Sequence, residues 1–130
     1  MITVFTPGCF DILHHGHIEL FKYCRSIGDE VIVGLNSDDS IRKIKGSNRP
    51  INNLKSRISV LNSIKYIDKV IVFEEEDPYN LIKNINPDIM VKGGDYKAED
   101  VIGKDLCEVR IFSYIDGYST TKSIQRFNSR

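Results

Sequence analysis

Five short apolar runs rich in β-branched residues alternate with segments of helical character, and this alternation limits the fold more than any other feature. The runs are Ile2 to Phe5, Glu30 to Leu35, Lys69 to Phe73, Asp88 to Gly93 and Glu108 to Phe112. Each is nearly continuous in its apolar character, which is typical of strands covered on both faces. Helical segments are predicted at Ile18 to Ile27, Leu54 to Ile67 and Pro78 to Ile85. The pattern predicts an α/β sandwich of three layers, in which a five-stranded parallel sheet carries helices on both faces.

The composition is that of one electrically balanced domain, which we expect to span residues 1–130. The 18 basic and 18 acidic residues cancel, so net charge does not favour nucleic acid or an anionic membrane as a partner. The three cysteines, Cys9, Cys24 and Cys107, form no CxxC pair, which indicates a reduced protein without a zinc site. Because no leader and no bilayer-length apolar segment is evident, the sequence predicts a cytoplasmic protein.

Polar residues and glycines gather directly after the predicted strands. They occupy positions 6–17 after the first strand, 36–38 after the second, 92–95 after the fourth and 113–121 after the fifth. In a parallel α/β sheet, ligands bind outside the carboxyl ends of the strands, where the strand order reverses. We therefore expect these four stretches to form one binding rim.

All three histidines, His14, His15 and His17, fall within four consecutive residues. If a helix begins near His14 or His15, then His14 and His17 lie on one face of its first turn. Unpaired backbone amides and the positive end of the helix dipole suit a phosphate there. The dipole also lowers the pKa of a nearby imidazole, which would keep it a neutral hydrogen-bond donor. Gly16 costs about 1 kcal/mol of helix stability relative to alanine, which indicates a close approach to the backbone.

These histidines have simpler alternatives, namely a surface cluster or core side chains held by their neighbours. Their position at a strand-to-helix turn behind Gly8 favours the binding interpretation.

The stretch GCFDILHHGH resembles the GxFDxxHxGH signature of the nucleotidyltransferase superfamily that includes cytidylyltransferases and small adenylyltransferases. NSD (36–38), KGSNRP (45–50), Arg57, VKGGDY (91–96) and DGYSTT (116–121) then follow in the order and spacing of the heptose-1-phosphate adenylyltransferases of ADP-heptose synthesis. The resemblance covers nearly the whole chain and implies a Rossmann-like domain. It also implies transfer of AMP from ATP to a sugar phosphate such as heptose 1-phosphate, with release of pyrophosphate, in surface polysaccharide or lipopolysaccharide precursor synthesis.

The resemblance further implies roles for individual residues. His14 and His17 would hold the triphosphate and stabilise charge on the α-phosphate, while Lys45 and Arg57 would be catalytic cations that neutralise the transition state. The expected nucleotide-binding residues are Thr6, Gly8, Cys9, Phe10, Gly16, Lys92, Gly94, Asp95, Tyr118, Ser119, Thr120 and Thr121. The expected substrate-binding residues are Asp11, Asp38 and Arg126. No metal ligand is expected within the chain, and Mg²⁺ would arrive with the nucleoside triphosphate.

Several of these positions admit a plainer interpretation. Gly8 is expected to leave room for a close phosphate, and Asp11 either orients its loop or caps the helix. Gly93 and Gly94 either admit the nucleotide or make a simple turn after the strand. The segment from 42 to 57 is expected to be a solvated linker, apart from Lys45 and Arg57. The stretch 119–121 either caps a final helix or clamps phosphates.

Two differences bear on the substrate. Glycerol-3-phosphate cytidylyltransferases carry an arginine five residues before the serine of STT and read GDD after the fourth strand, whereas this chain has Tyr114 and GGD. This favours ATP and a heptose phosphate. The alternatives are CTP with glycerol 3-phosphate or another small phosphate, and a nucleotide-binding module without turnover. Because 130 residues leave no room for the kinase domain often fused to the heptose enzyme, the resemblance implies a separate sugar kinase; a homodimer is expected by analogy.

Overall fold

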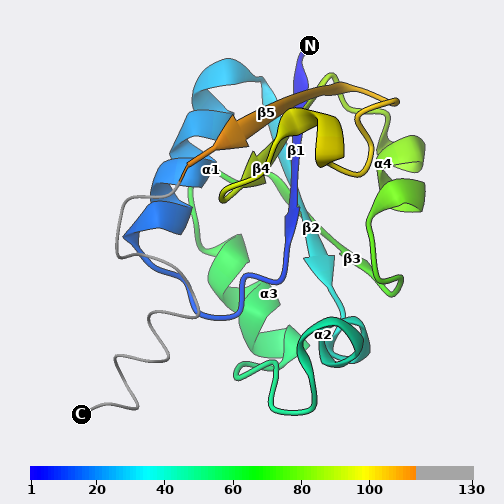
Figure 1. Ribbon diagram of the computed structural model, residues 1–130. Coiled ribbons are helices and arrows are strands. Elements are labelled where there is room, and N and C mark those ends of the chain that lie inside the picture. Colours follow the sequence, from blue (N-terminus) through cyan, green and yellow to red (C-terminus); the bar gives the residue numbers. More distant parts are fainter. Residues whose placement is uncertain (114–130) are drawn as a thin grey trace.

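The computed structural model describes residues 1–113 (Figure 1), so Tyr118, Ser119, Thr120, Thr121 and Arg126 lie outside the described residues. The elements are β1 (Thr3–Gly8), α1 (His15–Ile27), β2 (Glu30–Asn36), α2 (Asp38–Lys45), α3 (Leu54–Asn62), β3 (Lys69–Phe73), α4 (Tyr79–Ile85), β4 (Ile89–Gly93), the short 3₁₀ helix η1 (Ala98–Asp100) and β5 (Glu108–Phe112). No helix within residues 1–113 is long and apolar enough to cross a membrane.

The five strands form one sheet in the order β3-β2-β1-β4-β5, and every neighbouring pair is parallel. Alternate residues along the strands enter two separate cores. Val4 packs with α1 and α3 on one face, whereas Phe5 packs with α4 and the segment from 101 to 111 on the other. Figure 1 shows these helices on opposite sides of the sheet. The predicted three-layer α/β fold is therefore confirmed.

The central strands β1 and β4 are paired over only part of their length. β1 pairs with β2 from Thr3 to Gly8 but with β4 only at Val4 and Phe5. Pro7, which has no N–H to donate, is tolerated in a central strand because β4 is not paired with it there. The strand order reverses at this β1–β4 boundary, so the two strands part at the topological switch point of the sheet.

Helix α2 (Asp38–Lys45) was not predicted, and the expectation of a linker from 42 to 57 is wrong for residues 42–45, which form the second half of this helix. The Ser37 side chain caps the helix by accepting a hydrogen bond from the Ser40 backbone N–H at 3.1 Å. Acidic residues occupy the first turn and basic residues the last, which suits the helix dipole. These local signals stabilise a short helix despite its few buried apolar side chains.

Helix α3 is shorter than predicted and ends at Asn62 rather than Ile67. The chain turns there through tight bonds, from Ser63 N to Val60 O (3.1 Å) and from Ile64 N to Leu61 O (3.1 Å). Helix α1 begins at His15, three residues before the predicted segment Ile18 to Ile27 and within the start near His14 or His15 on which the histidine interpretation depended.

The close packing of β1 against β2 yields a stability prediction. A Cβ at Gly34 would overlap the ring of Phe5, whose Cε1 would lie 2.8 Å away. We expect Gly34→Ala to lower the free energy of unfolding by roughly 1–3 kcal/mol, measured by urea denaturation, because the ring has no free space to enter. The exposed Ser59→Ala is the control. In a Phe5→Leu background the cost of Gly34→Ala should shrink; an equal cost in both backgrounds would contradict the steric cause.

Candidate active site

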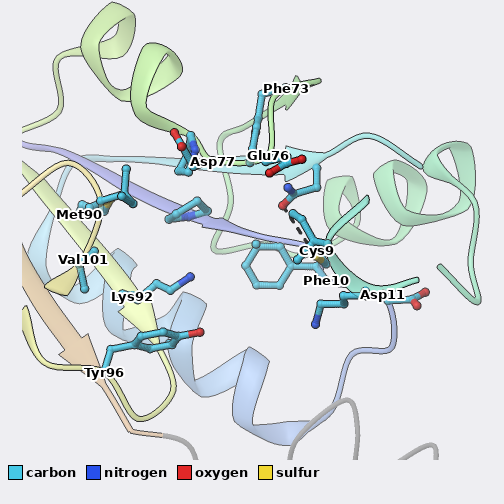
Figure 2. Close-up of a pocket in the computed structure, with 18 of the residues that line it drawn as sticks. Cys9, Phe10, Asp11, Phe73, Glu76, Asp77, Met90, Lys92, Tyr96 and Val101 are labelled. Carbon is cyan, nitrogen blue, oxygen red and sulfur yellow. Dashed lines mark hydrogen bonds between the residues drawn. The ribbon is translucent and has the colours of Figure 1, made fainter. Parts of the chain in front are cut away.

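A pocket of about 470 Å³ lies at the carboxyl ends of the strands, within the size range of small-molecule sites. Its walls include Pro7 and Gly8 of β1 and Lys92 and Gly93 of β4, so it opens where these two strands part. Figure 2 shows Phe73, Glu76 and Asp77 on one side of it and Lys92 and Tyr96 on the other. The expected rim at the strand ends therefore contains a cavity.

The two histidines of the HxGH motif are coupled at the N-terminus of α1. The Gly16 backbone N–H donates to His14 Nδ1 (3.0 Å), and the His14 backbone N–H donates to His17 Nδ1 (3.1 Å). A ring nitrogen that accepts a hydrogen bond carries no proton, so each neutral imidazole holds its proton on Nε2. The ring centroids lie 4.0 Å apart. The capping pattern therefore sets the tautomer of both side chains and makes Nε2 the donor atom of each.

His17 is buried, with 5% of its surface exposed, and it lines the pocket. Burial, followed by the nearby His14, lowers the pKa of His17 from 6.5 to about 3. The expectation of a neutral imidazole is thus confirmed for His17, although desolvation rather than the helix dipole is the leading cause. His15, in contrast, is exposed and lies 3.8 Å from Glu19.

The ring of Phe10 packs against the imidazole of His17. The backbone of Phe10 has a φ of 45°, and its ring contacts His17 edge to face, with 5.7 Å between centroids. A Cβ at Gly8 would lie 2.9 Å from the Phe10 ring. The Phe10 ring therefore gives a structural reason for glycine at position 8, and the expected approach of a phosphate to Gly8 stays a prediction.

Arg57 lies beneath the rim, with 1% of its surface exposed. Its Nη1 donates to the carbonyl oxygens of Cys9 (3.0 Å) and Asn36 (2.7 Å). Its Nε donates to Asn52 O (3.1 Å), and its Nη2 pairs with Asp38 at 2.6 Å. The guanidinium joins the ends of β1 and β2 to the start of α2 and to the loop before α3. In this structure it does not line the pocket and holds the rim in position, while its expected role as a catalytic cation stays a prediction.

The two aspartates predicted to bind substrate also hold the rim together. The Asp11 side chain is fully buried and accepts hydrogen bonds from the backbone N–H groups of Ile51 and Asn52, both at 2.7 Å. Figure 2 shows its carboxylate pointing away from the cavity. Of the two alternatives for Asp11, helix capping is wrong, because His14 caps α1; the carboxylate orients a loop, but it is the loop before α3 rather than its own. Asp38 pairs with Arg57 and lies outside the pocket lining.

Of the remaining residues that we expected to bind the nucleotide, some line the pocket and others lie outside its lining. Cys9 and Lys92 line the pocket, and burial raises the pKa of the Cys9 thiol. Burial also lowers the pKa of Lys92, whose Nζ lies 4.8 Å from the centroid of the Tyr96 ring.

The other positions lie outside the pocket lining. Thr6 is fully buried within β1, and Gly16 is buried in the first turn of α1. Gly94 makes a turn at φ 114° beside Tyr96, which is the plainer alternative for that position, and Asp95 is exposed.

Charges of opposite sign line the cavity. The cations Lys45, at the end of α2, and Arg49, in the loop that follows, lie among the lining residues with the carboxylates of Glu76 and Asp77. Sequence reasoning singled out Lys45 but missed the other three, because a charge in a loop gives no sign of the direction in which it points. Within residues 1–113, no group of three His, Cys, Asp or Glu side chains could hold a metal ion.

The lowered pKa of His17 leads to a pH prediction. Below pH 6.5 an unfolded histidine takes up a proton, whereas folded His17 does so only near pH 3. The contribution of neutral His17 to the free energy of unfolding is therefore fully present above about pH 6.5, and it is lost as the pH decreases towards about 3. Between about pH 7 and about pH 5.5, we expect the wild type to lose about 1 kcal/mol more unfolding free energy than His17→Gln. Equal losses, or an NMR titration of His17 near 6.5, would contradict this.

The contacts of Arg57 predict a large loss even when its charge is kept. Arg57→Lys leaves one amino group for four buried or half-buried partners, so we expect the free energy of unfolding to fall by at least about 2 kcal/mol. The exposed Arg42, which pairs with Asp39 on α2, offers Arg42→Lys as the matched control, with a change within about 0.5 kcal/mol. If the two variants unfold alike in urea, Arg57 does not hold the rim.

The cytidylyltransferase-like family model matches residues 5–126. The bifunctional protein HldE of Aliarcobacter butzleri (strain RM4018) is 52% identical over 124 residues, which cover 95% of this chain and 26% of that protein. The protein of the same name from a Nitratiruptor species is 49% identical over 127 residues, covering 97% and 28%. The chain thus spans about a quarter of the length of these curated relatives.

Solved structures agree with this match. The lipopolysaccharide core biosynthesis protein from Thermoplasma volcanium GSS1 is 31% identical with a TM-score of 0.73, covering 92% of this chain and 99% of that one. Pantoate-beta-alanine ligase from Francisella tularensis, 20% identical with a TM-score of 0.62 over 86% of this chain and 59% of its own, shares the fold. The resemblance drawn from the HxGH motif is confirmed, and the chain belongs to the cytidylyltransferase-like family of nucleotidyltransferases.

Proposed function

We propose that this chain transfers AMP from ATP to a phosphorylated sugar, heptose 1-phosphate, and releases pyrophosphate. The observation that carries the proposal is the pair of Nε2–H donors at the N-terminus of α1, whose tautomers are set by backbone hydrogen bonds. Because His17 is buried and its pKa is lowered to about 3, it offers a directed hydrogen bond and does not act as a proton donor near neutral pH.

The proposed reaction needs little covalent work from the protein. An oxygen of the sugar phosphate attacks the α-phosphorus in line, the bond from that phosphorus to the bridging oxygen breaks, and pyrophosphate leaves with the electron pair. Positioning and charge stabilisation therefore supply most of the catalysis. His14 and His17 donate to the triphosphate, while Lys45 and Lys92 supply positive charge along the pocket. Phosphate contacts from Tyr118, Ser119, Thr120, Thr121 and Arg126 are part of the proposal.

The lining of the pocket supports an acceptor that carries both a phosphate and hydroxyl groups. Cations suit the phosphate, and the carboxylates of Glu76 and Asp77 suit sugar hydroxyls, since an ionised carboxylate only accepts hydrogen bonds. The relatives named HldE and the lipopolysaccharide core biosynthesis protein support a place in lipopolysaccharide precursor synthesis.

Magnesium is proposed to enter as part of the substrate MgATP, because residues 1–113 offer no cluster of ligands for an ion of their own. A kinase activity outside this domain would supply the sugar 1-phosphate, in keeping with the word bifunctional in the name of the longer relatives. A cytoplasmic location and a homodimer complete the proposal.

The experiment is a pyrophosphate-release assay with magnesium, in which ATP, CTP, GTP and UTP are each paired with heptose 1-phosphate, other sugar 1-phosphates and glycerol 3-phosphate. We expect turnover with ATP and heptose 1-phosphate. His14→Ala and His17→Ala should each lower kcat/KM by at least about 100-fold, because each removes a donor to charge that develops in the transition state.

The matched control is His15→Ala, which removes an exposed imidazole from the same turn and should leave kcat/KM within about twofold of the wild type. Turnover with CTP and glycerol 3-phosphate would replace the proposed substrates. Nucleotide binding without turnover on any pair would contradict the proposed function.

A further inference from the structure

We propose that Arg49, held in place by Asp11, binds the phosphate group of the acceptor substrate. This inference rests on the proposed nucleotidyl transfer and assigns a residue to the recognition of its second substrate. Sequence reasoning placed Arg49 in a solvated linker, and only its position in the folded chain shows otherwise.

The guanidinium of Arg49 is mostly buried yet incompletely paired. Its side chain is 14% exposed, and its Nε donates to Asp11 Oδ2 at 3.1 Å. Neither terminal nitrogen has a hydrogen-bond partner among residues 1–113, and Nη2 is fully buried. Arg57, in contrast, uses Nε, Nη1 and Nη2 on protein oxygens. A desolvated guanidinium with unused donors is costly, and a phosphate in the pocket would supply the acceptor that Nη1 lacks.

Asp11 makes the position of Arg49 rigid. Besides Arg49, its carboxylate holds the backbone N–H groups of Ile51 and Asn52, and its carbonyl oxygen accepts from Asn52 Nδ2 at 2.7 Å. These bonds tie the loop on both sides of Pro50 to the end of β1. The guanidinium is therefore preorganised, and binding a phosphate there requires little further ordering of the protein.

The location of Arg49 favours the acceptor over the nucleotide. The nucleotide is expected in the crevice where β1 and β4 part, at the topological switch point. Arg49 instead lines the pocket together with Asn36 at the end of β2 and Lys45 at the end of α2, on the side of β1 away from β4. A second phosphorylated substrate must meet the triphosphate at close range, so it needs cations of its own. Arginine suits this role because its planar fork matches phosphate oxygens.

The test separates the two substrates kinetically. For Arg49→Ala we expect the KM for heptose 1-phosphate to rise at least about tenfold, while the KM for ATP stays within about twofold. Arg49→Lys should recover part of the loss, because it keeps the charge but not the fork. Arg42→Ala, which removes an exposed arginine of α2 outside the pocket lining, should change neither constant.

Thermal unfolding of each variant shows whether that variant is folded at the temperature of the kinetic assay. A rise in the KM for ATP with an unchanged acceptor KM would overturn the assignment, as would kinetics of folded Arg49→Ala that match those of Arg42→Ala.

A failure of this inference can be distinguished from a failure of the proposed function by calorimetry, which measures the affinities for heptose 1-phosphate and for unphosphorylated heptose. If the wild type shows no turnover but prefers the phosphorylated sugar and Arg49→Ala abolishes that preference, the function fails and the role of Arg49 stands. If turnover is present and Arg49→Ala keeps both the acceptor KM and the preference, the role of Arg49 fails and the function stands. If the wild type shows no turnover and does not bind the phosphorylated sugar, the proposed function and the role of Arg49 are both overturned.

Discussion

The guanidinium of Arg57 is the interaction on which the binding rim depends. Three segments of the chain reach it. Cys9 follows β1, Asn36 and Asp38 lie at the end of β2 and the start of α2, and Asn52 belongs to the loop before α3. Carbonyl groups at strand ends have no ladder partner and would be costly to bury alone. One buried cation therefore satisfies several of them at once and fixes how the loops leave the sheet.

Around this centre, the polar groups at the rim divide into those that hold the protein and those that face the pocket. Arg57 lies outside the pocket lining, and Asp11 borders the pocket but directs its carboxylate to backbone N–H groups of the protein. Arg49, Lys45 and Lys92 also line the cavity. The histidine pair is oriented by backbone hydrogen bonds and, for His17, by the ring of Phe10. Donors that are fixed before the substrate binds need no reorganisation during the reaction, and electrostatic catalysis depends on this property.

Sequence reasoning was accurate where the physical signal is local. The apolar runs located all five strands, and the helix start considered near His14 or His15 agrees with the start of α1 at His15. It was inaccurate for α2, whose few buried apolar residues hide it from periodicity, although Ser37 and the charges of its two end turns were a capping signal. It did not foresee the protein contacts of Gly8 and Arg57, because a motif marks such positions as important without showing which neighbours surround them.

The sequence by itself determined the layered fold, the family and the rim at which the site lies, because hydrophobic periodicity and short motifs are properties of neighbouring residues. The tertiary structure alone decided the direction of each charge at that rim. Asp11 and Arg49 are 38 positions apart and Cys9 and Arg57 are 48 apart, and contacts over such separations are set by how the loops pack over the strand ends. Whether a charged side chain faces the pocket or the protein is therefore a property of the fold and not of its local sequence.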